Sequence, residues 1–304
     1  MRAVVLINAK AGTVVERGGD ALCEEVRDAF AAAGHEVEAD CCDPVDMADR
    51  IGRTALRTDI DAIVVGGGDG TLSMAAAKLA GRKVALGFLP LGTMNLYCRA
   101  LGMPQDLDEA VRSLAGGRVE PADLGEVNGR LFLHHVSIGL QPAIVARRNR
   151  EDYTGRLGKM WATAKTFVRT LRNPKPVSVV LRLPDGDRPY RVPAIFVMSN
   201  PLRDGRPGIE QHHSAHRLGV YICTSVEWSD LLQIAAGMAT AAREDVDCLE
   251  LHKAPEVAIE RARKSRKTFR ASVDGEIVAF DAPLKFACRK DAFRLLVPSG
   301  APGG

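Results

Sequence analysis

Val64-Val65-Gly66-Gly67-Gly68-Asp69-Gly70-Thr71-Leu72 is the stretch of sequence on which the predicted fold depends. An apolar run at residues 62–65 leads into the glycines, and an Ala-rich segment typical of a helix follows them at residues 72–79. A strand that passes through glycines into a helix is where an α/β protein presents backbone N–H groups to an anion. The sequence therefore predicts a phosphate-binding loop at this position.

The glycines and Asp69 have distinct roles in this prediction. Glycines lack a Cβ, so Gly67, Gly68 and Gly70 let the backbone approach a phosphate closely. Asp69 could hold Mg²⁺ beside the phosphates or accept a proton from a hydroxyl. The alternative is a tight strand-to-helix connection with a capping aspartate. Neither GxGxxG nor a Walker Gly-Lys-Ser/Thr motif is present, so a dinucleotide fold of that kind and a P-loop are not supported.

Length and composition limit the class of protein. A chain of 304 residues is long for one core, so two domains are expected. A net charge of +3 is too small to indicate nucleic acid as a ligand. No apolar run approaches the roughly 18 residues that cross a bilayer, and no signal peptide is recognised, so we expect a cytoplasmic protein. Seven cysteines without a CxxC pair predict reduced thiols rather than disulfides or a zinc site.

The first part of the chain alternates between strand and helix patterns. Strands are expected at residues 3–7, from residue 37, at 62–65 and at 84–89, and helices after Asp20 as N-cap, from Pro44, at 72–79 and at 107–114. This order predicts a parallel sheet, and its loops at residues 8–13, 66–71 and 90–95 would meet at the carboxyl edge, where such sheets bind ligands. We place the end of this domain near Leu124.

Beyond that boundary the pattern becomes β-rich. Strands are expected at residues 130–136, 177–183, 190–198, 219–223, 256–260, 268–273, 277–280 and 286–288. Two helices are expected among them, at residues 154–171 and 228–242. A layered β domain fits this pattern.

Several motifs in a fixed order carry a family resemblance. They are Asn8-Ala9-Lys10-Ala11-Gly12-Thr13, the loop from Gly66 to Thr71, Pro90-Leu91-Gly92-Thr93-Met94-Asn95, Asp123-Leu124-Gly125, Ser137-Ile138-Gly139 and Asp274-Gly275-Glu276. Together they resemble the diacylglycerol kinase catalytic-domain family, which includes bacterial lipid kinases and the sphingosine kinases. The resemblance extends from about residue 1 to about residue 298.

The resemblance implies a fold of class α/β plus β. It has a Rossmann-like parallel-sheet domain at residues 1–124, joined by a C-terminal strand at about 290–298, and a β-sandwich lipid-substrate domain at residues 125–289. ATP and Mg²⁺ would bind in a cleft between the domains. The implied nucleotide-binding residues are Asn8, Gly12, Thr13, Gly67, Gly68, Gly70, Thr71, Gly92, Thr93 and Asn95, with Asp69 as catalytic residue and metal ligand.

Asp274 and Glu276 are the two carboxylates of the second domain with a predicted catalytic role. They are separated by one glycine, so they lie on one face of a strand or flank a tight turn. Either could act as the base that accepts the hydroxyl proton. A hairpin turn between residues 268–273 and 277–280 is compatible with that role.

The sequence also departs from the family pattern. Residues 214–220 stand where bacterial members usually carry an acidic Asp-Asp-Gly stretch linked to a metal, and Arg217 and Leu218 are interpreted as replacing those acids. Gln141 replaces a further acid. A structural Mg²⁺ is therefore in doubt, and more of the metal chemistry would fall to Asp69. We interpret His212, His213 and His216 as solvated loop histidines, because no carboxylate or cysteine lies at ligand spacing nearby in sequence.

The predicted reaction is transfer of the γ-phosphoryl group of ATP to a lipid hydroxyl, of diacylglycerol first and of a long-chain base second. Basic residues at 261–270 and in the helix at 154–171 would attract anionic headgroups, although a solvated charged face is the alternative. Peripheral membrane contact and a role in phospholipid biosynthesis are expected, nucleic acid is not, and a homodimer is allowed. The alternatives are an NAD kinase, which shares the Gly-Gly-Asp-Gly core, and a nucleotide-binding regulatory protein without turnover.

Overall fold

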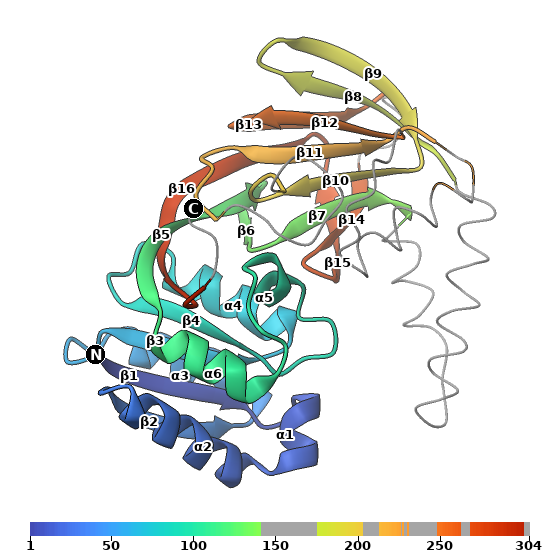
Figure 1. Ribbon diagram of the computed structural model, residues 1–304. Coiled ribbons are helices and arrows are strands. Elements are labelled where there is room, and N and C mark those ends of the chain that lie inside the picture. The colour runs from blue at the N-terminus through green and yellow to red at the C-terminus, as the bar shows by residue number, and fades with distance from the viewer. Residues whose placement is uncertain are drawn as a thin grey trace. The chain divides into compact units, whose positions relative to one another are not determined.

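The computed structural model describes residues 1–140, 175–202, 213–225, 227, 230, 248–262 and 268–300 (Figure 1). The chain divides into two compact units. The first contains Met1–Leu124, Glu210–His216 and Arg289–Gly304, and the second contains Gly125–Ile209 and Arg217–Cys288. Each unit is described by itself. The chain passes from the first unit to the second within one strand, β5 (Arg118–Val127), and returns within another, β16 (Leu284–Val297).

A parallel sheet forms the centre of the first unit. Its strands are β1 (Arg2–Asn8), β2 (Glu36–Cys42), β3 (Ala62–Gly67) and β4 (Ala85–Pro90). They lie in the order β2-β1-β3-β4, and every neighbouring pair is parallel. All residues of β3 and β4 are buried, as continuous apolar runs in parallel sheets usually are. The predicted parallel-sheet domain is confirmed.

Helices connect these strands. They are α1 (Gly12–Arg17), α2 (Gly19–Ala32), α3 (Pro44–Thr54), α4 (Asp69–Leu79), α5 (Leu96–Ala100) and α6 (Leu107–Ala115). Helix α2 packs beside α6 and α3 beside α4, so the two pairs cover opposite faces of the sheet (Figure 1). The end of β16 adds to this sheet, because Arg294 and Leu295 pair in parallel with Ala85 and Leu86 of β4. The end of β16 thus belongs to the sheet of the first unit.

The start of α3 agrees with the sequence prediction, whereas the start of α2 does not. Pro44 occupies the first turn of α3 as predicted, and the side chain of Asp43 caps it by accepting the N–H of Val45 at 3.1 Å. The N-cap of α2, however, is Gly18 and not Asp20, which lies inside the first turn. The prediction for Asp20 was wrong because α1, which the sequence pattern did not reveal, ends immediately before Gly18 and fixes where α2 begins.

The second unit contains two antiparallel layers. One is a six-stranded sheet in the order β12-β11-β10-β7-β14-β15. Its strands are β7 (His135–Gly139), β10 (Ala194–Met198), β11 (Leu218–Cys223), β12 (Leu249–Ala254), β14 (Thr268–Val273) and β15 (Glu276–Asp281). The other layer contains β8 (Val177–Leu183), β9 (Gly186–Val192), β13 (Glu256–Arg261) and the first part of β16, and β6 (Arg130–Phe132) pairs with β5.

The core of the second unit lies between these layers. Buried side chains from both sheets form one hydrophobic cluster, with Ile195, Val220 and Phe269 from the first layer and Leu181 and Ile259 from the second. The predicted β-sandwich is confirmed by this arrangement. Two expected strands are each divided in two, at residues 130–136 into β6 and β7 and at 190–198 into β9 and β10. The sequence pattern did not predict strands β5 and β12.

The expected helices at residues 154–171 and 228–242 lie outside the described part of the chain, apart from isolated positions. Gln141, His212 and most of the basic run, residues 263–267, lie outside it as well. Among the residues that are described, no helix is long and apolar enough to cross a membrane.

Candidate functional site

Three loops meet at the carboxyl edge of the parallel sheet, as the sequence predicted. They follow Asn8 at the end of β1, Gly67 at the end of β3 and Pro90 at the end of β4. The first and second loops are joined by a hydrogen bond from Asn8 Nδ2 to Thr71 Oγ1 at 3.1 Å. The other side of the Asn8 amide accepts the N–H of Lys10 at 2.9 Å. Asn8 therefore fixes the shape of the first loop and ties it to the start of α4.

Asn95 organises the third loop. Its side chain accepts the N–H of Gly92 at 2.8 Å and donates to the carbonyl oxygen of Pro90 at 3.2 Å. The residue is buried and left-handed, with φ 49°, a conformation that asparagine adopts more readily than most side chains. Thr93 and Met94 between these anchors are exposed. The loop is thus rigid at its ends and presents Thr93 and Met94 outward.

The second and third loops touch at Gly92. A Cβ at Gly92 would lie 2.6 Å from the Cα of Gly68 and 2.9 Å from Asn95 Oδ1. A Cβ at Gly66 would lie 2.7 Å from the Leu91 side chain, and a Cβ at Gly67 would lie 2.8 Å from the Thr71 side chain. A side chain at Gly92 would therefore collide with the backbone, whereas one at Gly66 or Gly67 would displace a neighbouring side chain.

Gly12 and Gly70 differ from those three. A Cβ at either position would meet nothing within 4 Å, and neither residue has a positive φ. Gly70 lies in the first turn of α4, where N–H groups have no partner within the helix. Packing within the protein does not explain these two glycines, and the backbone at both positions is open to close approach by a ligand.

Asp69 is the first residue of α4, and the N-cap is Gly68. Its carboxylate accepts the N–H of Tyr97, at the start of α5, at 3.3 Å. It also lies close to the Cys98 thiol, whose pKa is raised first by burial and then by the Asp69 charge. Gly68, and not Asp69, is the N-cap of α4, and the bond from Tyr97 to Asp69 joins α4 to α5. Thr13 is held weakly, with its hydroxyl 3.5 Å from the carbonyl oxygen of Leu91.

Asp274 and Glu276 lie in the second unit, at the hairpin between β14 and β15. Asp274 and Gly275 have φ values of 45° and 92°, so they form the tight turn that was expected. The Asp274 carboxylate accepts three backbone N–H groups, from Leu133 at 2.7 Å and from His134 and His135 at 2.9 Å.

Glu276 has a different environment from Asp274. It is exposed and pairs with Arg130 at 2.7 Å. Asp274 therefore holds the turn to the start of β7 and the two residues before it, whereas the Glu276 carboxylate is exposed. The geometry distinguishes two carboxylates that the sequence left equivalent.

The prediction of solvated loop histidines was wrong for His213, whereas His216 is exposed. His213 is buried and its Nε2 lies 2.7 Å from Glu120 Oε2. His216 Nδ1 lies 3.2 Å from Asp123 Oδ1, and Asp291 completes a group of three candidate metal ligands. The carboxylates were missed because they are distant in sequence and reach the loop through β5 and β16. His212 lies outside the described residues.

The fold and site together define a two-unit protein with an α/β unit, which carries glycine-containing loops at the carboxyl edge of its parallel sheet, and a β-sandwich unit. Residues 2–127 match the model of the diacylglycerol kinase catalytic domain, which confirms the family resemblance drawn from the motifs. A protein of Pseudomonas aeruginosa described as "Probable lipid kinase YegS-like" is 40% identical over 143 residues, 45% of this chain and 47% of that protein. The aligned region thus spans about half the length of that relative.

Two further comparisons extend over more of the chain. A diacylglycerol kinase of Staphylococcus saprophyticus is 26% identical over 252 residues, 80% of this chain and 79% of that protein. The crystal structure of a diacylglycerol kinase from Bacillus anthracis has a TM-score of 0.69 at 19% identity and covers 97% of this chain and 96% of its own. At that identity the structural likeness shows the fold alone.

Proposed function

We propose that this protein is an ATP-dependent lipid kinase, which transfers the γ-phosphoryl group of ATP to a hydroxyl of diacylglycerol or, as second choice, of a long-chain base. The observation that carries the proposal is the open space at Gly12 and Gly70, in the first turns of the helices α1 and α4, which follow the neighbouring parallel strands β1 and β3. The family match over residues 2–127 and the names of the relatives support the reaction class.

The first unit supplies the nucleotide-binding groups. Backbone N–H groups at the start of α4 would donate to an anion bound there, and the helix dipole favours negative charge at that end. Thr71 and Asn8, which bond to each other, and the rigid loop held by Asn95 would shape the pocket around the phosphates. These groups orient the nucleotide for in-line transfer and stabilise the charge that develops on the phosphoryl oxygens.

Asp69 fits the Mg²⁺ that such a transfer uses. A carboxylate oxygen is the ligand type that Mg²⁺ prefers, and Asp69 stands at the same helix start as the proposed phosphate site. Bound there, the ion would neutralise charge on the phosphates. Asp69 would hold it, and the contact of Asp69 with the N–H of Tyr97 would keep the carboxylate oriented.

Within the second unit we assign the general base to Glu276 and a positioning role to Asp274. A base needs an accessible oxygen, and the three N–H groups on Asp274 already occupy lone pairs of its carboxylate. The Glu276 side chain is 66% exposed and contacts Arg130. The ion pair with Arg130 would hold the Glu276 carboxylate in place until the substrate hydroxyl arrives.

Contact with an anionic membrane surface is part of the proposal. Arg261 stacks over the ring of Phe269 at 4.3 Å from its centroid, and Arg270, the residue after Phe269 on β14, is exposed. Basic groups near such a surface contribute about 1 kcal/mol each. The contact would be peripheral.

The experiment is a transfer assay with γ-labelled ATP and Mg²⁺, in which vesicles containing diacylglycerol, vesicles containing a long-chain base, and NAD are offered separately. Label in a lipid supports the proposal and identifies the lipid. Label in NAD refutes it in favour of an NAD kinase. ATP binding without transfer to any acceptor would leave a nucleotide-binding regulatory protein, and an Asp69→Asn variant is the control for contaminating kinases.

A further inference from the structure

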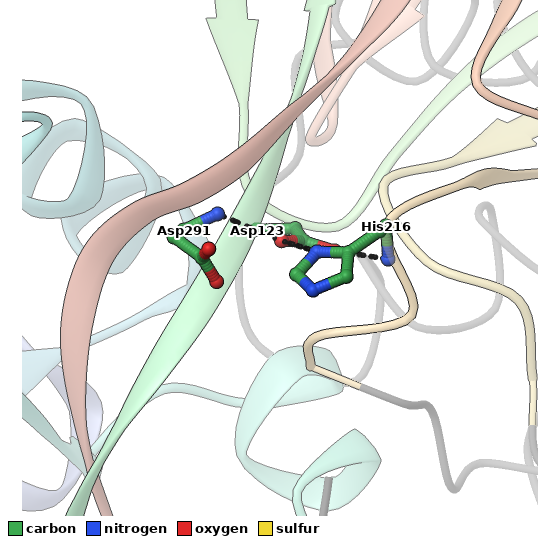
Figure 2. A group of neighbouring side chains, drawn as sticks. All are labelled: Asp123, His216 and Asp291. Carbon is green, nitrogen blue, oxygen red and sulfur yellow. Dashed lines mark hydrogen bonds and ion pairs between the residues drawn. The ribbon is translucent and has the colours of Figure 1, made fainter.

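Three side chains from separate parts of the first unit converge at one point. Asp123 comes from β5, His216 from the loop before β11, and Asp291 from β16 (Figure 2). Their candidate ligand atoms, one from each residue, all lie within 4.8 Å of one another. Two carboxylates and one imidazole at this spacing are a ligand set that holds divalent cations.

Asp123 is fixed at the centre of this group. Its side chain is completely buried, its Oδ2 accepts the N–H of His216 at 2.7 Å, and its Oδ1 accepts the N–H of Asp291 at 3.0 Å. Both neighbours have a left-handed backbone, with φ 56° at His216 and 48° at Asp291. The backbone bonds therefore orient Asp123 independently of either neighbour's side chain.

The distance from His216 Nδ1 to Asp123 Oδ1 is 3.2 Å. A charge-assisted hydrogen bond between such atoms is usually about 2.7–2.9 Å long, so this contact is a long one. Two ligands about 2.0–2.1 Å from a tetrahedral cation are separated by about 3.3 Å, which is close to the observed spacing. The two atoms are thus placed well to share a cation.

The charge of the group favours a cation as well. Asp123 and Asp291 bring two carboxylates together, and within the described part of the chain the structure shows no lysine or arginine paired with either. Two carboxylates at such a distance repel each other unless positive charge lies between them. His216 supplies at most one charge, and its side chain and Asp291 are accessible from solvent, so an ion can enter and water can complete its coordination.

We propose that Asp123, His216 and Asp291 form a site for a first-row divalent transition metal such as Zn²⁺, which binds through Asp123 Oδ1, His216 Nδ1 and a carboxylate oxygen of Asp291. An imidazole ligand selects Zn²⁺ or Co²⁺ over Mg²⁺, which prefers oxygen alone. The bound ion joins β5, the loop and β16. This inference does not rest on the proposed kinase activity.

The test uses the full-length protein, stripped with a chelator and free of nucleotide and lipid. Co²⁺ and Zn²⁺ are titrated and followed by visible absorption and calorimetry, with Mg²⁺ as the comparison ion. We expect one Co²⁺ per chain with visible bands typical of nitrogen and oxygen ligands, displacement by Zn²⁺, and Mg²⁺ affinity at least 100-fold weaker. A rise in the melting temperature with Zn²⁺ accompanies binding.

Variants distinguish metal binding at this site from metal binding by the seven cysteines. Asp291→Asn keeps the backbone N–H that holds Asp123, so its apo melting temperature should stay near that of the wild type while Co²⁺ affinity falls at least tenfold. His216→Ala should abolish the bands, and Asp281→Asn, an exposed carboxylate on β15, is the matched control that should change neither. Binding unaffected by Asp291→Asn and His216→Ala, sulfur-to-cobalt charge-transfer bands, or no Co²⁺ binding at all would overturn the proposal.

Discussion

Replacing Gly70 by alanine tests whether this glycine is needed for ligand binding or for the stability of the fold. A methyl group at Gly70 meets nothing within 4 Å, and the residue lies in the first turn of α4 without a positive φ. Alanine lowers the entropy of the unfolded chain and favours a helix, so stability should be unchanged or rise by up to about 1 kcal/mol. For a unit of this size that is at most a rise of about 2–4 °C in melting temperature.

The same methyl group points into the proposed phosphate site. If ATP lies against the α4 N-terminus, the Cβ displaces it, and we expect the affinity for ATP to fall at least tenfold, or about 1.4 kcal/mol. Calorimetric titration with a non-hydrolysable ATP analogue measures the affinity, and a thermal melt of the same sample measures the stability. ATP affinity equal to that of the wild type, in a folded Gly70→Ala variant, would falsify the placement of the phosphates.

Further predictions concern the neighbouring loop, the candidate carboxylates and one histidine. Gly92→Ala forces a Cβ to within 2.6 Å of the Cα of Gly68, and overpacking of this kind costs about 1–3 kcal/mol, so a thermal melt should show loss of stability, unlike Gly70→Ala. Asp69→Ala should abolish transfer in the labelled-ATP assay while the melting temperature stays within a few degrees; a collapse in stability instead means that this aspartate is structural. Glu276→Gln should lower turnover by about 10²–10⁴-fold without a change in stability. Asp274→Ala removes the acceptor of three N–H groups, so denaturant melts should show a loss of about 1–3 kcal/mol in the free energy of unfolding. If Glu276→Gln lowered stability and Asp274→Ala lowered only turnover, the roles of the two carboxylates would be exchanged. Burial, followed by the neighbouring His135, lowers the pKa of His134 in the folded protein. The unfolded chain therefore binds an extra proton below about pH 6.5, and the stability of the fold is lost as the pH falls through that range. NMR should show that the His134 ring is still neutral at pH 5.5, and a ring already protonated at that pH would contradict the prediction.

The sequence predicted most of the first unit because its signals are local. Apolar runs predicted β3 and β4, Pro44 marked the start of α3, and the glycines at residues 66–68 marked the passage from β3 into α4. Helix α1 was missed because six residues are too few to show a helical period. Parallel order then brought three loops together, since the carboxyl ends of parallel strands share one edge.

Contacts between distant residues could not be predicted in this way. Nothing near His216 in sequence announces Asp123 or Asp291, which lie 93 and 75 positions away, yet β5 and β16 bring both to the loop. The same holds for Asp274, whose partners at residues 133–135 are about 140 positions earlier. The spacing within Asp274-Gly275-Glu276 identified two carboxylates, but only these partners distinguish their roles.

The late arrival of β16 has a consequence for how the chain is made. Until Arg294 and Leu295 leave the ribosome, β4 is an edge strand, and every one of its residues belongs to the core. An uncovered apolar edge is a template for pairing with another chain. During synthesis about 200 residues are therefore added between β4 and the strand that completes the sheet of the first unit. A chain without the residues after Cys288 should aggregate rather than fold into a smaller protein.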